Sequence, residues 1–589
     1  MPFDGTVIYA IKEELKSKII DSRIEKIYQP RKDTVLFYLR KNGQPYHLLV
    51  SSDPANPRIH LTKAEFENPQ SPPMFCMLLR KHLMNGRISN ITQPDFERII
   101  YIDIESLNEK GIMDTKRLII EIMGRHSNII LTMPQKNIVL DGIKRLTGDI
   151  SSYRTIIPGS CYISPPNPGK LNPLTTDQEL IIKTFKNNPE QKVYKILVDS
   201  FNGISPKLAK EIAEKAGVSP STASNELSQK QLKSISEVFY LIFQQLQKKN
   251  ITPYVYIDIS NQKPVDFSVF RFETLCQYKC KKFLSVNEAL DYYFSVKEEF
   301  LLFNQMKSEL KKIIDFNLKR CSKKLELQKS RLQEAEDADK YKLLGELITS
   351  NIFRLKKGQT EAELINYYSQ TPSKIRISLD PKLTPSQNAQ KYFKKYSKLK
   401  NALEVVKKII KQSSSEKKYF ENVLHTLEQA ADIQDLNEIR NELISEGYIK
   451  SQKKIPSGNT ETKKEPLQFI SKQGFIILVG RNNQQNDFLT MKTARPDDIW
   501  MHTKEIPGAH VIIRSKGNLN IPEETLYEAA NLAAFYSKGR HSSNVAVDYT
   551  QKKNVRKPKG AKPGMVIYDN YKTIYVTPSE TKIPQITNE

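Results

Sequence analysis

The densest cluster of chemically active side chains lies near the C-terminal end of the chain, at residues 551–563. The stretch contains no acidic residue and six cations: Lys552, Lys553, Arg556, Lys557, Lys559 and Lys562. Pro558, Gly560 and Pro563 are typical of a flexible loop. Cationic charge without an acidic counterpart in such a loop is suited to contact with phosphate groups. A merely solvated basic surface is the alternative.

Two further candidate cations, Arg481 and Lys492, precede this stretch, together with the only tryptophan, Trp500. The neighbours of Trp500 include residues that can bind metals, namely Asp498, His502 and His510. They do not form a ligand set with the spacing of known metal sites. We therefore predict no metal site here, and we expect Trp500 to pack within its domain and to contact RNA.

A second candidate site is a tight turn at residues 202–206, with the sequence Asn-Gly-Ile-Ser-Pro. A glycine turn followed by proline at a helix start, with Leu208 and Ile212 four residues apart, is typical of a helix-hairpin-helix. The backbone N–H groups of such a turn can bind a phosphate. An ordinary turn between two helices fits the spacing equally well.

The charge of the whole chain points to the same class of partner. Lys and Arg outnumber Asp and Glu in this chain of 589 residues, which gives a formal net charge of +25. A polyanion is the natural partner of such a surplus, although a generally basic proteome would also produce it. No glycine-rich P-loop is present, so we expect no nucleotide cofactor and no hydrolytic activity.

We expect a cytoplasmic protein. No stretch approaches the roughly 20 apolar residues of a membrane span, and the N-terminal residues lack the pattern of a signal peptide. The five cysteines are an odd number, which suits a reducing compartment. Cys276 and Cys280 have no second cysteine pair or nearby histidine, so they predict no metal site.

These candidate residues must be positioned by several domains, because the chain is too long for one core. Residues 1–172 predict a mixed α/β domain, with helices near 3–18 and 74–83 and two sets of short strands. Residues 173–282 predict a helical segment followed by a small strand-rich one. The fold class is thus multidomain α+β.

Heptad spacing at 303–332 and 392–431 predicts two long helices within residues 283–450. Because an insertion at about 341–385 separates them, we expect an antiparallel coiled-coil hairpin with a small tip domain rather than a dimeric zipper. A linker at 451–466 then leads to an α/β domain at 467–580, which contains a helix near 523–538.

The order of these parts, and eight short motifs, resemble the NFACT family. The motifs are FDG at 3–5, EIMGRHSN at 121–128, LDP at 379–381, PSQNAQKYF at 385–393, VGRNN at 479–483, DIWMH at 498–502, PGAHV at 507–511 and KGAKPG at 559–564. The resemblance spans nearly the whole chain. It implies that the N-terminal domain has a glycosylase-like fold and that the C-terminal domain binds RNA.

The resemblance implies a function that composition could not. Bacterial members of the family bind a stalled large ribosomal subunit that carries peptidyl-tRNA, and they recruit alanyl-tRNA. They thereby direct template-free addition of alanine to the nascent chain, which marks it for degradation. Peptide bonds are made by the ribosome, so the protein is expected to be no enzyme. A small RNA-binding partner of the RqcP type is implied as well.

The resemblance also assigns site residues. In relatives an Asp-Arg pair is associated with tRNA binding, and the matching residues are Glu97 and Arg98. Glu97 departs from the usual Asp by one methylene group, so its role is less secure than that of Arg98, whose guanidinium fork suits phosphate. The second motif adds Glu121, Ile122, Met123, Arg125 and His126. We expect Arg481, Lys492 and the six cations of 551–563 to contact ribosomal RNA.

Two other functions remain open. The family resembles the formamidopyrimidine-DNA glycosylases, whose N-terminal proline amine is the nucleophile, and Pro2 would be its counterpart. Those enzymes place Glu after the proline, whereas Phe3 follows here, and their four-cysteine zinc finger is missing. The family's older name, fibronectin-binding protein A, suggests a surface adhesin with fibronectin as partner, but no export signal is recognised.

Overall fold

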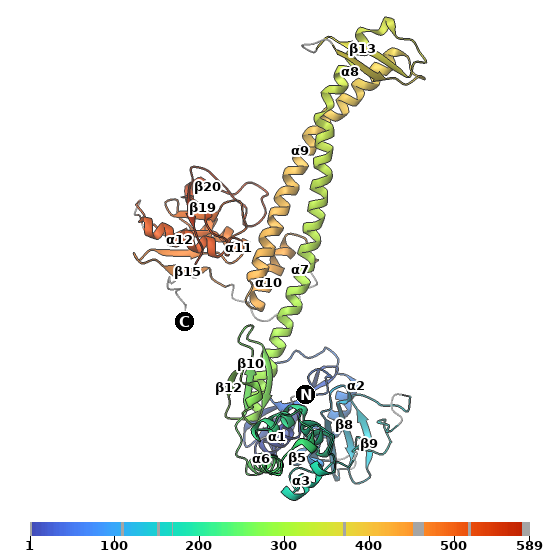
Figure 1. Cartoon of the computed structure of the whole chain (residues 1–589), viewed down its shortest axis with the longest axis vertical. Coiled ribbons are helices and arrows are strands. Elements are labelled where there is room, and N and C mark those ends of the chain that lie inside the picture. Colours follow the sequence, from blue (N-terminus) through green and yellow to red (C-terminus); the bar gives the residue numbers. More distant parts are fainter. Residues whose placement is uncertain are drawn as a thin grey trace. The chain divides into compact units, whose positions relative to one another are not determined.

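The computed structural model describes residues 3–107, 111–149, 153–167, 169–368, 373–450, 464–515, 517 and 520–579 (Figure 1). It is a mixed α/β, multidomain structure that divides into two compact units, Met1–Leu301 and Leu302–Glu589. Pro2 and most of the predicted linker at 451–466 lie outside the described residues. No helix in the described ranges is both long enough and apolar enough to cross a membrane.

A nine-stranded antiparallel sheet forms the frame of the first unit, in the order β4-β3-β2-β1-β5-β6-β7-β8-β9. Its strands are β1 (Arg23–Arg31), β2 (Thr34–Lys41), β3 (Gln44–Ser51), β4 (Arg58–Leu61), β5 (Arg87–Thr92), β6 (Ile99–Leu107), β7 (Met113–Glu121), β8 (Asn128–Met133) and β9 (Ile138–Gly142). Helices α1 (Gly5–Ile19) and α2 (Met74–Leu83) pack on this sheet. The sequence predicted α2 with the same bounds, but it missed β4 and β5 and therefore read one sheet as two strand sets.

Helices and a small sheet complete the first unit. The helices are α3 (Gln178–Lys186), α4 (Val193–Ser200), α5 (Pro206–Lys215) and α6 (Gln229–Gln247). Strands β10 (Tyr254–Ile257), β11 (Pro264–Ser268) and β12 (Lys279–Lys282) form the small sheet. Phe96, in the connection between β5 and β6, and Phe243 of α6 pack at 5.5 Å between ring centroids. One apolar core thus joins the large sheet to the helices that follow it.

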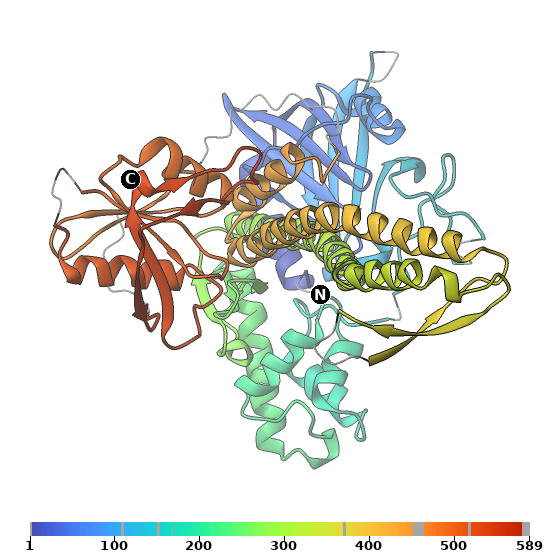
Figure 2. The ribbon, with the colours of Figure 1, turned by 90° about the horizontal axis from the view of Figure 1, so that it is seen from above.

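Long helices dominate the first part of the second unit. Helix α7 (Val286–Glu336) runs into it from the first unit, and α9 (Pro385–Gln429) lies along α7 in Figures 1 and 2. Leu310 and Ile314 of α7 share an apolar cluster with Phe420 and Val423 of α9. The predicted heptad runs fall on these two helices, as the coiled-coil pattern requires, except at Ala431, which follows the end of α9.

Between α7 and α9 lie α8 (Ala338–Ser350) and the two-stranded sheet of β13 (Glu361–Asn366) and β14 (Ser373–Ser378). They have their own apolar cluster, which includes Leu347, Leu364, Ile377 and Ala389 at the start of α9. Helix α9 is followed by the short helix α10 (Ile433–Ser445), whose Leu436, Ile439 and Leu443 pack into the α7–α9 cluster.

Residues 464–579, called the C-terminal domain below, form a six-stranded sheet in the order β15-β16-β18-β17-β19-β22. The strands are β15 (Leu467–Ile470), β16 (Ile476–Val479), β17 (Ile499–Thr503), β18 (Val511–Ile513), β19 (Val545–Gln551) and β22 (Lys572–Val576). Helix α12 (Glu523–Phe535) packs on one face, as Figure 2 shows in orange and red. The short helix α11 (Asn483–Phe488) and the strand pair β20 (Val555–Arg556) and β21 (Ile567–Tyr568) complete the domain.

Candidate nucleic-acid interface

A cavity of about 350 Å³ in the first unit brings two sequence-predicted sites together. We call it the N-terminal cavity. Glu97, Arg98 and Met123 line it, and so does the turn at residues 202–206. The residues that the family resemblance associates with tRNA therefore lie beside the turn that the spacing suggested for phosphate.

The first motif of the chain positions this turn. The Asp4 carboxylate caps α1 by accepting hydrogen bonds from the backbone N–H groups of Thr6 and Val7, at 3.1 and 3.2 Å. It also accepts a 2.8 Å hydrogen bond from the Ser205 hydroxyl. Burial raises the pKa of Asp4 although these hydrogen bonds oppose the rise. The FDG motif thus joins α1 to the residues that precede α5.

Two glycines allow the turn to approach α1 closely. The Gly5 N–H donates a 2.7 Å hydrogen bond to the Gly203 carbonyl. Gly203 has φ of +68°, and a Cβ there would lie 2.4 Å from the Phe96 carbonyl oxygen and 2.8 Å from the Gly5 Cα. Only glycine fits this backbone conformation and this space. Packing therefore explains Gly203, while phosphate binding by the turn stays a prediction.

Glu97 and Arg98 stand at the start of β6 and are half-buried. The Arg98 carbonyl accepts a 2.9 Å hydrogen bond from the Ile122 N–H, which places the two family motifs side by side. Burial raises the pKa of Glu97, and the charges of Arg98 and Lys170 oppose the rise. The cavity wall thus combines a guanidinium, an ammonium and two carboxyl groups, those of Glu97 and Asp4.

The side chains of the EIMGRHSN motif at 121–128 are divided between the core and the surface. Glu121 is 1% exposed and Ile122 is 0% exposed, so neither side chain reaches the surface. The Glu121 carboxylate forms two 2.6 Å hydrogen bonds with the Arg154 guanidinium and accepts a 3.0 Å hydrogen bond from the Tyr162 hydroxyl. These two residues hold the end of β7 rather than line the cavity.

Arg125 and His126, by contrast, are exposed, and the Arg125 Nε–H donates a 2.9 Å hydrogen bond to His126 Nε2. Sequence reasoning missed Lys170 and Asn202 as cavity-lining side chains. Lys170 lies in a proline-rich stretch that reads as a linker, and it carries no periodic signal. Asn202 belongs to the predicted turn, but its amide, which donates to the Asp95 carbonyl at 3.1 Å, is placed only by the fold.

The cationic stretch at 551–563 is more ordered and better paired than the sequence predicted. Lys557 forms an ion pair with Asp487, Lys562 with Glu446 at 2.7 Å, and Arg556 with Asp569 at 3.3 Å. The prediction of uncompensated charge is therefore wrong for these three, because their acidic partners are distant in sequence or follow the stretch. Val555 and Arg556 also form strand β20, so the prediction of a flexible loop is wrong there.

The remaining predicted cations are accessible. Arg481, Lys492, Lys553 and Lys559 are exposed, and Lys552 is half-buried. Within the described ranges, these five side chains form no ion pair. An RNA backbone can reach these side chains without first breaking an ion pair.

Trp500 is 0% exposed and packs 4.8 Å from the Tyr568 ring. The packing half of the prediction is confirmed, and the RNA-contact half is wrong because the side chain has no surface. Of the two histidines beside it, His510 is buried and His502 is half-buried. Burial lowers the pKa of His502 to about 4 and that of His510 well below its ordinary value.

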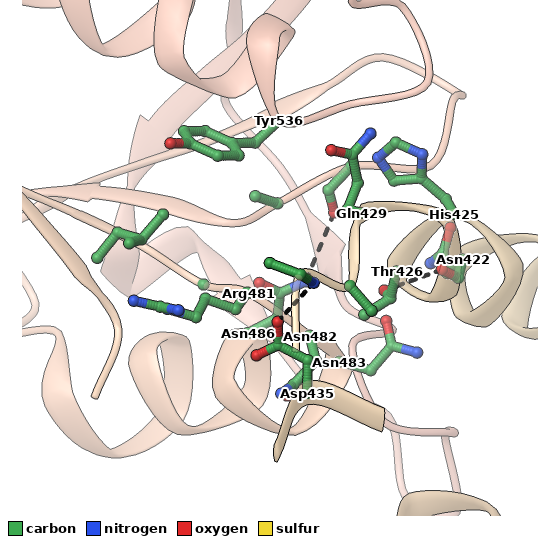
Figure 3. A pocket seen from close by; sticks show the side chains of 16 residues that line it. Asn422, His425, Thr426, Gln429, Asp435, Arg481, Asn482, Asn483, Asn486 and Tyr536 are labelled. Atoms are coloured by element: carbon green, nitrogen blue, oxygen red, sulfur yellow. Dashed lines mark hydrogen bonds between the residues drawn. The ribbon is translucent and has the colours of Figure 1, made fainter. Parts of the chain in front are cut away.

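The VGRNN motif lines a small cavity of about 150 Å³ in the second unit, shown in Figure 3. Arg481, Asn482 and Asn483 lie on one side of it, and His425 of α9 and Tyr536 lie opposite. The motif's two asparagines belong to the surface at which the C-terminal domain meets α9 and α10, and only Arg481 of the three is exposed.

Comparisons with known proteins agree with this arrangement of parts. The family described as NFACT N-terminal and middle domains matches residues 4–462, and the NFACT protein RNA binding domain matches residues 466–570. A protein named Rqc2 homolog RqcH from Bacillus subtilis (strain 168) is 38% identical over 98% of this chain and 98% of its own length. One of the same name from Streptococcus pneumoniae serotype 2 is 36% identical over 99% of each. Human ribosome quality control complex subunit NEMF is 23% identical over 91% of this chain and 56% of that protein.

Proposed function

This chain belongs to the NFACT family, and we propose that it is a ribosome quality-control factor that binds RNA and acts on stalled large ribosomal subunits. The observation that carries the proposal is similarity along the whole chain to proteins named for this role. The net charge of +25 supports it, because both partners would be RNA. The protein would work in the cytoplasm, associated with ribosomes.

In its finer form, the proposal is that the protein binds a large subunit obstructed by peptidyl-tRNA and recruits alanyl-tRNA. Alanine is then added to the nascent chain without a template, and the tail marks the chain for degradation. The ribosomal peptidyl transferase centre makes the bonds, so this protein acts as a recruiter and not as an enzyme. A small RNA-binding protein of the RqcP type would assist it.

The N-terminal cavity is the proposed contact with tRNA. Arg98 would provide a two-pronged contact with phosphate or a base edge, which a guanidinium forms better than an ammonium group. Glu97 would orient Arg98 or accept a hydrogen bond, and exposed Arg125 and His126 would extend the contact outward. Glu121 and Ile122 would act as positioning residues, because both are buried.

Exposed cations of the C-terminal domain are the proposed contact with ribosomal RNA. Double-helical RNA is recognised mainly through its shape, phosphates and 2′-hydroxyl groups, for which Lys and Arg suffice. Arg481, Lys492, Lys553 and Lys559 meet this requirement directly. Lys557 and Lys562 would first have to leave their acidic partners.

A sucrose gradient of cell extract tests the proposal. The protein should migrate with free large subunits, and sequencing of the RNA that copurifies with it should return alanine tRNA above its share of total tRNA. Migration only at the top of the gradient would contradict the ribosomal role. Enrichment of another tRNA would leave that role intact and would contradict alanine as the added residue.

A further inference from the structure

Helix α10 presents a stripe of three glutamates to the C-terminal domain. Glu438, Glu442 and Glu446 are spaced four residues apart, which places them on one face of the helix and its C-terminal end. We call these three residues the glutamate stripe. Each of them contacts a different side chain of the C-terminal domain, and none of the contacts was visible in the sequence.

The contacts run from one end of the stripe to the other. The Asn482 amide donates to Glu438 at 2.5 Å, and the Asn483 amide donates to Glu442 at 3.0 Å. Lys562 donates to Glu446 at 2.7 Å. The three donors belong to the VGRNN and KGAKPG motifs. Lys562, which the sequence predicted to contact ribosomal RNA, and the two asparagines of VGRNN thus hold an acidic helix of the same chain.

Of the three donors, Lys562 has the most contacts with the helical part of the second unit. Besides its ion pair with Glu446, its ammonium lies 4.8 Å from the centre of the Tyr448 ring and 5.8 Å from that of Tyr419, within range of cation–π attraction. The same loop is fixed a few residues later, where the Gly564 N–H donates to Asp487 at 3.1 Å. In this position Lys562 is only partly exposed, and its charge is already balanced by Glu446.

An RNA backbone would offer these donors the same chemistry as the stripe does, namely a row of anionic oxygens that accept hydrogen bonds. We propose that the glutamate stripe of α10 occupies part of the RNA-binding surface of the C-terminal domain, so that α10 and an RNA backbone compete for Asn482, Asn483 and Lys562. This inference rests on the proposed function, because it presupposes that the domain binds RNA.

Competition has a thermodynamic consequence. If RNA must displace α10 from the domain, any change on α10 that weakens this contact tightens RNA binding, and RNA in turn weakens the α10 contact. Couplings of this kind are commonly about 5-fold to 150-fold in affinity. The contact would therefore hold the domain closed until a high local concentration of RNA phosphate is met.

The test uses the full chain and a fluorescein-labelled RNA duplex as the probe. Glu438→Gln with Glu446→Gln keeps the size and one acceptor of each side chain but removes both charges. This double variant should bind the duplex about 5-fold more tightly or better. Glu442 is left unchanged because it is buried.

The matched control is Glu334→Gln with Glu336→Gln on α7, two exposed glutamates whose replacement removes the same total charge. The affinity of this control variant for the duplex should stay close to that of the parent protein. Equal tightening in both double variants would mean that net charge alone is responsible, and unchanged affinity in both would also overturn the competition.

A charge exchange distinguishes the contribution of Lys562 to RNA binding from the contribution of its ion pair with Glu446. Lys562→Glu should weaken binding of the duplex, and adding Glu446→Lys should restore the ion pair but not the affinity. Hydrogen exchange gives the second readout: saturating RNA should accelerate exchange in 482–488 and in α10 of the parent protein and of the α7 control. The acceleration should be smaller in Glu438→Gln with Glu446→Gln, in which the contact is already weakened. Full recovery of RNA affinity in the exchanged pair would overturn the inference. If the parent protein binds no RNA at all, the proposed function fails as well.

Discussion

Arg98 is the residue on which the tRNA proposal depends most directly. Arg98→Ala should strongly reduce the tRNA that copurifies with the protein, because a neutral side chain cannot replace a charge-assisted contact. Arg98→Lys should restore it only in part, since a point charge lacks the guanidinium fork. The measurement is a pull-down in which bound tRNA and ribosomal RNA are quantified side by side.

A suitable control for this substitution is Arg145→Ala, which removes the exposed partner of Asp141 elsewhere on the same sheet. It should leave both RNA classes unchanged, as surface substitutions usually alter stability by no more than about 0.5 kcal/mol. A parallel loss of tRNA and ribosomal RNA in Arg98→Ala would identify Arg98 as a general folding or docking residue. No change in either would contradict its assignment.

Glu442 makes the stability of the second unit depend on pH. Burial raises its pKa from 4.5 to about 7, while the hydrogen bond from Asn483 opposes the rise. The folded state therefore binds more protons than the unfolded state between these values, so the free energy of unfolding falls as pH rises through this window. The loss is of the order of 3 kcal/mol and is complete above about pH 7.

Glu442→Gln should remove this dependence. The glutamine can still accept the hydrogen bond from Asn483, but it carries no buried charge. Thermal unfolding should therefore show the variant to be more stable than the parent protein near pH 8 and nearly equal to it near pH 5. Glu428→Gln, an exposed position on α9, should shift neither curve. A variant that is less stable than the parent at both values would contradict the pKa assignment.

At the residue scale, the sequence located charges better than it located their partners. It marked Lys557, Lys562 and Glu121, but their partners lie 70, 116 and 33 residues away along the chain. A local sequence pattern cannot predict pairs of residues that are so far apart along the chain. The regular spacing of the glutamate stripe was the one signal that could have been read, and it resembles an ordinary solvated helix face.

At the element scale, periodicity found most of the first unit and failed where the period is broken. Strand β5 has a bulge between Ile88 and Asn90, so the two buried residues Ile88 and Ile91 are three positions apart instead of two. Strand β4 is four residues long and buries Arg58 and His60 along with Ile59, which hides its alternation. The boundaries of α2 were predictable because a proline pair precedes an amphipathic run.

The turn before α5 gives a prediction at this scale. Gly203→Ala should destabilise the first unit by more than about 2 kcal/mol, because a left-handed conformation and a backbone clash add together. Because the turn lines the N-terminal cavity, tRNA copurification should fall too. Thermal unfolding followed by circular dichroism measures the first effect.

Gly217 offers a matched control, since its φ is +71° but no atom lies within 4 Å of the position of a Cβ. Gly217→Ala should destabilise the first unit only through conformational strain, by about 1 kcal/mol. The difference between the two variants isolates the close approach of Gly203 to Gly5 and Phe96. Equal destabilisation would show that this approach is looser than the structure indicates.

At the scale of the whole molecule, the net charge of +25 predicts binding that depends strongly on salt. If several Lys and Arg side chains neutralise phosphates, the affinity for large subunits should fall by about 10³-fold or more between about 50 and 200 mM salt. Equilibrium binding of labelled protein across this range is the measurement. A nearly flat response would mean that ribosome binding, if it occurs, depends on protein contacts.

Composition and periodicity could predict a multidomain basic protein with long helices, and they could go no further. The proposal of a ribosomal subunit as partner came from ordered motifs such as KGAKPG, because a family's partners are not encoded in charge. The structure adds that residues of these motifs also stabilise the fold. Asp4 of FDG caps a helix, and Lys562 of KGAKPG forms an ion pair within the chain.

The burial of Trp500 has an optical consequence. It is the only tryptophan among 589 residues, and it lies in one apolar cluster with Leu489, Ile512 and Val555. Fluorescence excited selectively at tryptophan therefore comes from a single place in the C-terminal domain, although the chain also contains 27 tyrosines. Its wavelength should shift toward the red only when that cluster admits water. The intact protein thus carries its own label, with which the opening of this domain can be followed in solution without any chemical modification.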